Sequence, residues 1–180
     1  MASSPTTRRI LRLAGDVLGG WLRDRDRTSR RPAPAPRRGT PAPEGGGTGY
    51  PGDFAGPVTP VYDPHPDGHP DPGEVVWTWV PYEEDHAQGK DRPVLLIGRD
   101  GPWLLAVPLT SKDHDRDAEQ EARAGRHWVD VGRGAWDRQG RPSEARVDRI
   151  VRVAPEDVRR EGAVLPADRF AAVAEAVTRR

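Results

Sequence analysis

Two short stretches of this sequence combine a cation, hydroxyl groups and strand-like apolar residues in a way that suits phosphate chemistry. Residues 89–93 read Gly-Lys-Asp-Arg-Pro and lead into the apolar run 94–97, and residues 107–112 read Val-Pro-Leu-Thr-Ser-Lys. Each stretch joins a strand to a loop, so Arg92 and Thr110 can lie at neighbouring strand ends. A planar guanidinium can hold two phosphate oxygens, and a hydroxyl can donate to the same group. The two stretches predict a site that handles phosphate.

Four neighbouring residues extend this predicted site. Gly89 and Lys90 precede the arginine, and Ser111 and Lys112 follow the threonine. A second hydroxyl can donate to phosphate, and lysine side chains commonly position phosphate through charge. We expect these four residues to bind substrate.

A proton acceptor for such a site is less obvious, because a guanidinium is a poor base. The loop before the arginine contains four titratable residues at 83–86, and we take His86 and Glu84 as the candidate general bases. The sequence does not choose between them. A purely structural explanation also exists, in which Arg92 pairs with Asp91 or Glu84 and the Thr110 hydroxyl caps its own loop.

The composition limits the folded part of the chain to about a hundred residues. Pro and Gly together account for 40 of the 180 residues. Most of them precede residue 71, in a segment too poor in large apolar residues to offset the entropy of an ordered chain. Cysteine is absent, which excludes disulfides, thiolate metal sites and cysteine nucleophiles.

No metal or cofactor is expected from the remaining ligand-type residues. The stretch 65–71 holds two histidines and two aspartates, but their spacing matches no rigid site and the prolines among them favour a loop. The N-terminus lacks the apolar core of a secretory signal, and no apolar run approaches the ~20 residues of a membrane span. We therefore expect a cytoplasmic protein.

The charge is unevenly distributed, although the formal net charge is zero. Residues 1–38 contain ten arginines and three aspartates, so they carry a net charge of +7 and the remainder carries −7. Within residues 8–22 the apolar side chains fall at helical spacing, and three glycines would fray such a helix in isolation. This basic segment is either an inert tail or a contact for RNA, a partner or an anionic surface.

These patterns predict three regions. Residues 1–27 form a basic amphipathic segment, residues 28–72 a disordered linker rich in Pro and Gly, and residues 73–180 a folded domain. In the domain, strands are expected at 74–80, 92–98 and 103–107 as an antiparallel meander.

The second half of the domain continues with short elements. A charged excursion at 113–126 precedes a strand at 127–131, and one or two more strands are expected in 144–153. Pro155 is typical of a helix start with Gly162 as its stop. A closing helix would present Phe170, Val173, Ala174 and Val177 on one apolar face. Short strands with a late helix favour a small, highly curved barrel.

Taken in order, these segments resemble the MazF/PemK-type toxin family of type II toxin-antitoxin systems. The resemblance is carried by the strand at 74–80, the loop ending in Gly89 and Arg92-Pro93, the run 94–97, and the segment 107–111. Downstream, residues 128–131 resemble a later strand of the family, residues 148–150 its acid-Gln-aliphatic segment, and residues 165–177 its terminal helix. The resemblance covers roughly residues 73–177.

The resemblance implies an SH3-like barrel of the CcdB/MazF type, mainly β with a C-terminal helix and here preceded by a disordered extension. It implies a homodimer that acts as a sequence-specific, metal-independent endoribonuclease on single-stranded RNA and is restrained by a cognate antitoxin. The family's catalytic arginine corresponds to Arg92 and its catalytic hydroxyl to Thr110. The sequence departs from the family in its acidic 82–90 loop and in Arg149, which stands where Gln is usual.

Two other functions stay open at this point. The same barrel could bind DNA, RNA or a partner protein without cutting, or it could be an effector tethered by its basic N-terminal segment. Five tryptophans could stack on unpaired bases, although we expect most of them to be core residues in so small a barrel. They are Trp77, Trp79, Trp103, Trp128 and Trp136.

Overall fold

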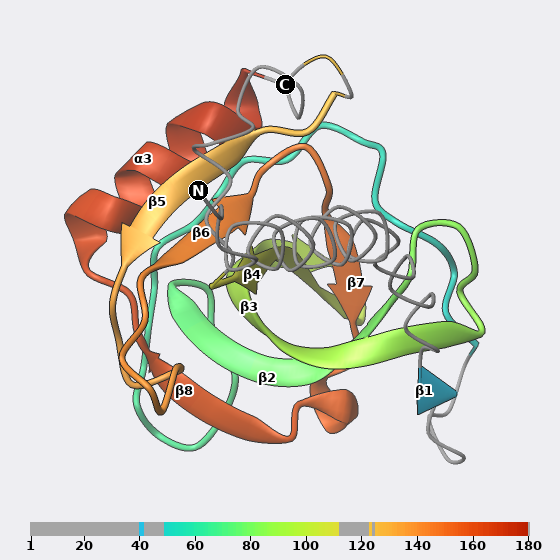
Figure 1. Ribbon diagram of the computed structural model, residues 1–180, viewed down its shortest axis with the longest axis horizontal. Helices are drawn as coiled ribbons and strands as arrows, with labels where there is room; N and C mark the ends of the chain where they lie inside the picture. The colour runs from blue at the N-terminus through green and yellow to red at the C-terminus, as the bar shows by residue number, and fades with distance from the viewer. Residues whose placement is uncertain (1–39, 42–48, 112–122, 124, 180) are drawn as a thin grey trace, which may run out of the picture. The chain divides into compact units, whose positions relative to one another are not determined.

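The computed structural model describes residues 40–41, 49–111, 123 and 125–179, and the predictions for residues 1–39 lie outside this part of the chain. The described residues form a mainly β domain that ends in a helix (Figure 1). Its strands are β1 (Thr40–Pro41), β2 (Glu74–Pro81), β3 (Gln88–Asp100), β4 (Trp103–Thr110), β5 (Trp128–Gly132), β6 (Ser143–Arg146), β7 (Val151–Val153) and β8 (Arg160–Val164). A 3-10 turn, η2 (Pro155–Asp157), precedes β8, and the helix α3 (Ala167–Thr178) closes the chain.

The sheet is strongly curved, and strand β4 pairs with three others, β3, β6 and β7. Its strand order is β5-β6-β4-β3-β2-β8, with β1 added to β3 and β7 added to β4. Strand β4 pairs with β7 through residues 104–106 and with β6 through residues 109–110. A register shift near Gly98 interrupts the pairing of β3 with β4, and such shifts increase the local bend of a sheet. Figure 1 shows the resulting curved wall, with α3 lying along β5.

The alternation of side chains divides the apolar residues between two cores. Leu95 and Ile97 of β3 belong to the larger core, which also includes the buried face of α3. Val94 and Leu96 of the same strand belong to a smaller core on the opposite face, beside β7. The predicted mainly β barrel with its C-terminal helix is thus confirmed, including the meander formed by β2, β3 and β4. In α3, the buried residues are Phe170, Val173 and Val177, as predicted.

Residues 49–72, called the strap below, pack against the barrel, so the predicted disordered linker is wrong for this stretch. The Phe54 amide donates to the Ile150 carbonyl at 2.8 Å, and the Val61 amide donates to the Ile97 carbonyl at 2.9 Å. The Tyr62 hydroxyl donates to the Leu165 carbonyl at 2.9 Å, and its ring lies 5.1 Å from that of Phe170. The strap packs on the core through Phe54 and Val58. Residues 28–48 contain no large apolar side chain that could do the same.

The helix predicted to start at Pro155 and to stop at Gly162 is also wrong. Only η2 is helical there, and the chain then joins β2 as strand β8. The Arg159 amide donates to the Trp77 carbonyl at 2.9 Å, so the backbone of this segment pairs with the edge of β2. Tertiary pairing overrode the local helix signal. No helix in the described part of the chain is long and apolar enough to cross a membrane.

Candidate functional site

The β3–β4 pairing explains how Arg92 and Thr110 come together. Val94 lies opposite Pro108 and Leu95 lies opposite Val107. Arg92 and Thr110 each lie two residues beyond the last pair of this ladder, on neighbouring strands. Directly opposed residues of an antiparallel pair point to the same face of the sheet. Both residues line one hollow of about 350 Å³. The structure therefore places Thr110 at the end of β4 and Arg92 within β3, on the wall of the same hollow.

The wall of this hollow comes from β2, β3, β4 and the turn between β5 and β6. Lys90 and Ser111, which were predicted to bind substrate, line it together with Arg92 and Thr110. Apart from Trp77 and Trp136, which were named as possible stacking residues, the remaining lining side chains were not predicted to take part in the site. They are Trp77, Asp91, Pro93, Leu109, Trp136, Asp137, Arg138, Gln139, Arg141 and Ser143.

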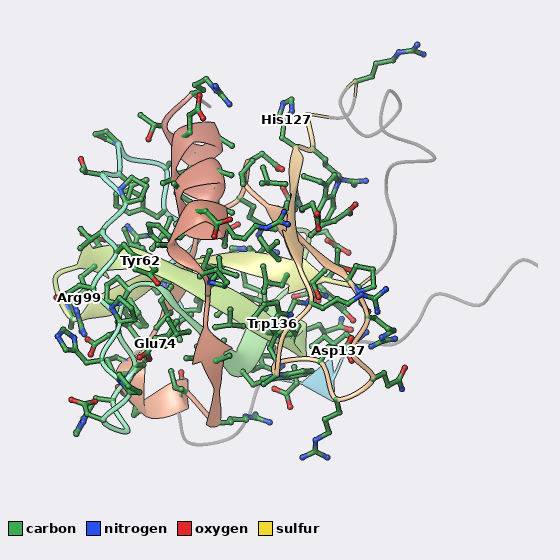
Figure 2. The ribbon with its side chains drawn as sticks, turned by 90° about the vertical axis from the view of Figure 1, so that its left-hand side faces the viewer. Tyr62, Glu74, Arg99, His127, Trp136 and Asp137 are labelled. Carbon is green, nitrogen blue, oxygen red and sulfur yellow. The ribbon has the colours of Figure 1, made fainter. Side chains whose placement is uncertain are left out.

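The turn at one side of the hollow is held rigidly by Trp136. This indole is 2 % exposed and donates to the Ser143 hydroxyl at 3.1 Å. The backbone carbonyl of Trp136 accepts a hydrogen bond from the Trp77 indole at 3.0 Å. A Cβ on Gly134 would lie 2.0 Å from the Trp136 ring, so only glycine fits there. Figure 2 shows Trp136 with Asp137 next to it, away from Tyr62 and Arg99 at the other side of the domain.

The hollow has an excess of positive charge. Its two acidic side chains are already paired, Asp91 with Arg159 at 2.5 Å and Asp137 with Arg141 at 2.8 Å. Three further cations line it without an ion pair to any residue that the structure describes. They are Lys90, Arg92 and Arg138. An anionic ligand would therefore be attracted to this end of the barrel.

Arg92 is the most unusual of these cations, because its side chain is partly buried and no carboxylate among the described residues pairs with it. Its Nε is buried and has no hydrogen-bond partner. Burial lowers the pKa of Arg92 from its usual value, and the nearby charges of Arg149 and Arg146 lower it further while Tyr82 opposes them. The structure does not show the pairing with Asp91 or Glu84 that a structural explanation required. A buried, uncompensated cation is costly unless it serves a ligand.

The two arginines next to Arg92 differ from it because both carry carboxylate partners. Arg146 donates to Asp148 at 2.8 Å and to Glu83 at 2.8 Å. Arg149, whose side chain is 8 % exposed, donates to both oxygens of Asp53, at 2.7 and 3.2 Å. Burial works against ionisation of Asp53, but hydrogen bonds from Arg149 and Tyr50 outweigh it and lower the pKa of this carboxyl.

The strap supplies two residues to this cluster that the sequence did not lead us to expect. The Tyr50 hydroxyl donates to Asp53, and burial together with that carboxylate raises the pKa of Tyr50. The Tyr50 ring meets the imidazole of His86 edge to face, with 5.0 Å between the ring centres. The signal available in the sequence was the reappearance of aromatic residues at Tyr50 and Phe54 after a stretch without them.

The other predicted residues lie in different surroundings. His86 and Glu84 are exposed in the 82–87 loop and do not line the hollow. Gly89 is buried, and a Cβ there would lie 2.5 Å from the Trp79 ring, which gives this glycine a packing reason of its own. Lys112 lies outside the described residues. The expectation that most of the five tryptophans are core is wrong, because only Trp136 is buried and the other four are partly exposed.

The described residues offer no arrangement of three or more His, Asp or Glu side chains that could hold a metal ion. In the strap, His65 lies 3.7 Å from Asp63 and 3.6 Å from Asp71. Asp71 also pairs with Arg99 at 3.1 Å, so this group is an exposed ionic cluster.

The functional candidate is thus a cationic hollow on the wall of a small curved barrel. Residues 71–179 match the family described as the PemK-like, MazF-like toxin of type II toxin-antitoxin systems. The match spans more than half of the chain, which therefore belongs to this family. No curated protein matches the chain.

Solved structures of low sequence identity resemble this chain. MazF (Form-I) from Deinococcus radiodurans is 22% identical, with a TM-score of 0.44 over 62% of this chain and 94% of that one. MazE-MazF (Form-II) from the same organism is 23% identical, with a TM-score of 0.42 over 62% and 94%. The Mycobacterium tuberculosis toxin MazF-mt6 is 21% identical, with a TM-score of 0.38 over 58% and 93%.

Proposed function

We propose that this protein is a cytoplasmic endoribonuclease that cuts single-stranded RNA at preferred sequences, with Arg92 and Thr110 as its catalytic residues. The observation that carries the proposal is the partly buried Arg92, whose Nε has no hydrogen-bond partner, on the wall of the same hollow as Thr110. The family match adds support, because it assigns the chain to toxins of toxin-antitoxin systems. Lys90 and Ser111 line the same hollow and would bind the phosphate backbone.

The chemistry needs no metal ion, because RNA carries its own nucleophile. The 2'-hydroxyl attacks the adjacent phosphorus, the bond from phosphorus to the 5'-oxygen breaks, and the 5'-oxygen takes up a proton from water, which gives a 2',3'-cyclic phosphate and a 5'-hydroxyl. Arg92 would hold the non-bridging oxygens and stabilise the charge that develops on them, while Thr110 or Ser111 donates a further hydrogen bond. His86 or Glu84 would accept the proton from the 2'-hydroxyl.

The test uses two arginines of the same strand. Purified full-length protein is incubated with a long RNA of mixed sequence in the presence of a metal chelator, and cleavage sites are mapped from the new 5' ends. Arg92→Lys keeps the charge but loses the planar fork, and we expect it to slow cleavage by about 100-fold or more. Arg99→Lys is the matched control, because Arg99 is exposed and pairs with Asp71. Equal rates for Arg92→Ala and the wild type would remove the assigned mechanism.

Binding without cleavage is the second candidate, because neither proposed base lines the hollow. In that case RNA would stay intact in the same incubation while its electrophoretic mobility shifts. Loss of the shift in Arg92→Ala, with RNA intact throughout, would favour a binding module over an enzyme.

Membership of a toxin-antitoxin family also leads us to propose a cognate antitoxin and a homodimer. The solved structure from Deinococcus radiodurans holds MazE together with MazF. Co-expression with the product of a small neighbouring gene should rescue cell growth, and size-exclusion chromatography with light scattering should give twice the mass of the chain.

A further inference from the structure

The strap lies outside the region that matches the family, apart from its last two residues, yet it contacts Arg149 and His86. The family match starts at residue 71, whereas the strap already meets the arginine cluster at Tyr50 and Asp53. Arg152 fixes this end of the strap by donating to the carbonyls of Gly52 at 2.9 Å and Asp53 at 3.1 Å. The strap therefore supplies the carboxylate that pairs with Arg149, whose charge acts on Arg92, and the ring that contacts His86.

Asp53 determines how many hydrogen-bond donors of Arg149 remain available to a ligand. Both carboxylate oxygens accept hydrogen bonds from this buried guanidinium, which also donates to the Pro81 carbonyl at 2.9 Å. A guanidinium held in this way is neutralised and has few donors left for another anion. Without Asp53, a second unpaired cation would lie near Arg92 and compete with it for phosphate.

Tyr50 connects the same carboxylate to the loop that contains His86. Its hydroxyl donates to Asp53, and its ring meets the imidazole at an angle of 81°. The residues around His86, from Glu83 to Ala87, are exposed. The Tyr50 contact is thus the one aromatic restraint on this imidazole within the part of the chain that the structure describes.

We propose that the strap takes part in the function of the site, and that its residues Asp53 and Tyr50 are positioning residues. Asp53 keeps Arg149 in a neutral pair, and Tyr50 holds His86 in place, so that phosphate binds at Arg92 rather than at Arg149. This inference rests on the function proposed above. It assigns to the strap a role in directing the substrate phosphate.

The direct test follows inorganic phosphate by NMR, with full-length protein labelled with nitrogen-15 and the side-chain Nε–H signals assigned through Arg92→Lys and Arg149→Lys. In the wild type, phosphate should shift the Arg92 signal and leave the Arg149 signal in place. In Asp53→Asn, the Arg149 signal should shift as well. Asp71→Asn is the matched control, because Asp71 is also a strap carboxylate paired with a barrel arginine, on the side away from the hollow.

Kinetics on RNA with a mapped cleavage site supply the second readout. Asp53→Asn should lower kcat by about tenfold while KM changes much less, because misplacement affects the reacting geometry more than the net attraction. Tyr50→Phe should lower kcat by about threefold, since it loses only a hydrogen bond. Tyr62→Phe is its control, because Tyr62 also donates a hydroxyl hydrogen bond from the strap but lies away from the hollow.

A double variant covers the case in which Asp53→Asn fails to fold. Asp53→Asn combined with Arg149→Gln removes both charges, so it should fold, keep the phosphate-induced shift at Arg92 and recover most of the lost kcat. Asp53→Asn and Tyr50→Phe that behave like their controls in both readouts would overturn the role of the strap. A wild type that shifts the Arg92 signal but cuts no RNA would remove the proposed enzyme and leave the strap's role standing.

Discussion

Two regions of this barrel each shield an arginine from solvent, Arg149 almost completely and Arg92 in part, and the two side chains differ in their partners. On the strap side, Arg149 donates to Asp53 and to the Pro81 carbonyl. At the hollow, the Nε of Arg92 has no partner, and the charge of Arg149 adds to its cost. The side chain of Arg149 and the Nε of Arg92 are both shielded from water, but only Arg149 is compensated within the described protein.

The difference teaches how a structural charge can be told from a functional one. A guanidinium that serves the fold is surrounded by acceptors, because its desolvation must be offset in the folded protein. A guanidinium that serves a ligand keeps donors unused, and the fold accepts the loss of stability. If this interpretation is correct, replacing each arginine by an apolar side chain should change stability in opposite directions.

The largest effect is expected for Arg149→Met. This change removes one partner of a buried ion pair and leaves the Asp53 carboxylate partly desolvated, since its side chain is only 27% exposed. We expect the free energy of unfolding to fall by about 3 kcal/mol. Urea unfolding followed by tryptophan fluorescence measures it, and an unchanged midpoint would show that the pair contributes nothing to the fold.

A smaller change of opposite sign is expected for Arg92→Met. This substitution removes a buried donor without a partner and relieves repulsion from Arg149 and Arg146. We expect the free energy of unfolding to rise by about 1 kcal/mol, while RNA cleavage is lost. The same urea titration applies. A destabilised Arg92→Met protein would mean that the guanidinium supports the fold and would weaken its assignment as a ligand group.

The sequence could predict one side of this comparison but not the other. Arg92 and Thr110 were found because each follows or precedes an apolar strand, and strand pairing then fixes their proximity. The ion pair of Arg149 joins residues 96 positions apart, and no local pattern encodes such a distance. The strap was missed because its prolines resemble those of residues 28–48, although its aromatic residues gave it enough apolar surface to dock.

The strands show the same limit. The meander of β2, β3 and β4 followed from β-branched runs and turn residues. Strand β8 could not be predicted in this way, because its segment carries helix signals and forms a strand by pairing with the edge of β2. Periodicity therefore predicted the elements that are locally consistent, and tertiary pairing decided the rest.

A moderate, pH-dependent effect should come from Asp53. Its pKa lies below the ordinary carboxyl value of about 3.9 in the folded protein, so the unfolded chain binds the proton more tightly. The stabilisation is therefore fully present above about pH 4 and is lost as the pH falls through the folded pKa. Thermal unfolding between pH 3 and pH 7 should show a smaller acid loss in Asp53→Asn with Arg149→Gln than in the wild type. Parallel curves would exclude Asp53 as a source of acid sensitivity.

The smallest effect is expected for Arg99→Met at the far end of β3. Arg99 is exposed and donates to Asp71 at 3.1 Å and to the Pro70 carbonyl at 3.2 Å. Because water competes for both partners and salt screens the charges, an exposed pair of this kind contributes less than about 1 kcal/mol. Urea unfolding should therefore give nearly equal midpoints for Arg99→Met and the wild type, and the difference should shrink further at high salt. A loss as large as that of Arg149→Met would show that the pairing of an arginine, rather than its burial, determines its contribution in this barrel.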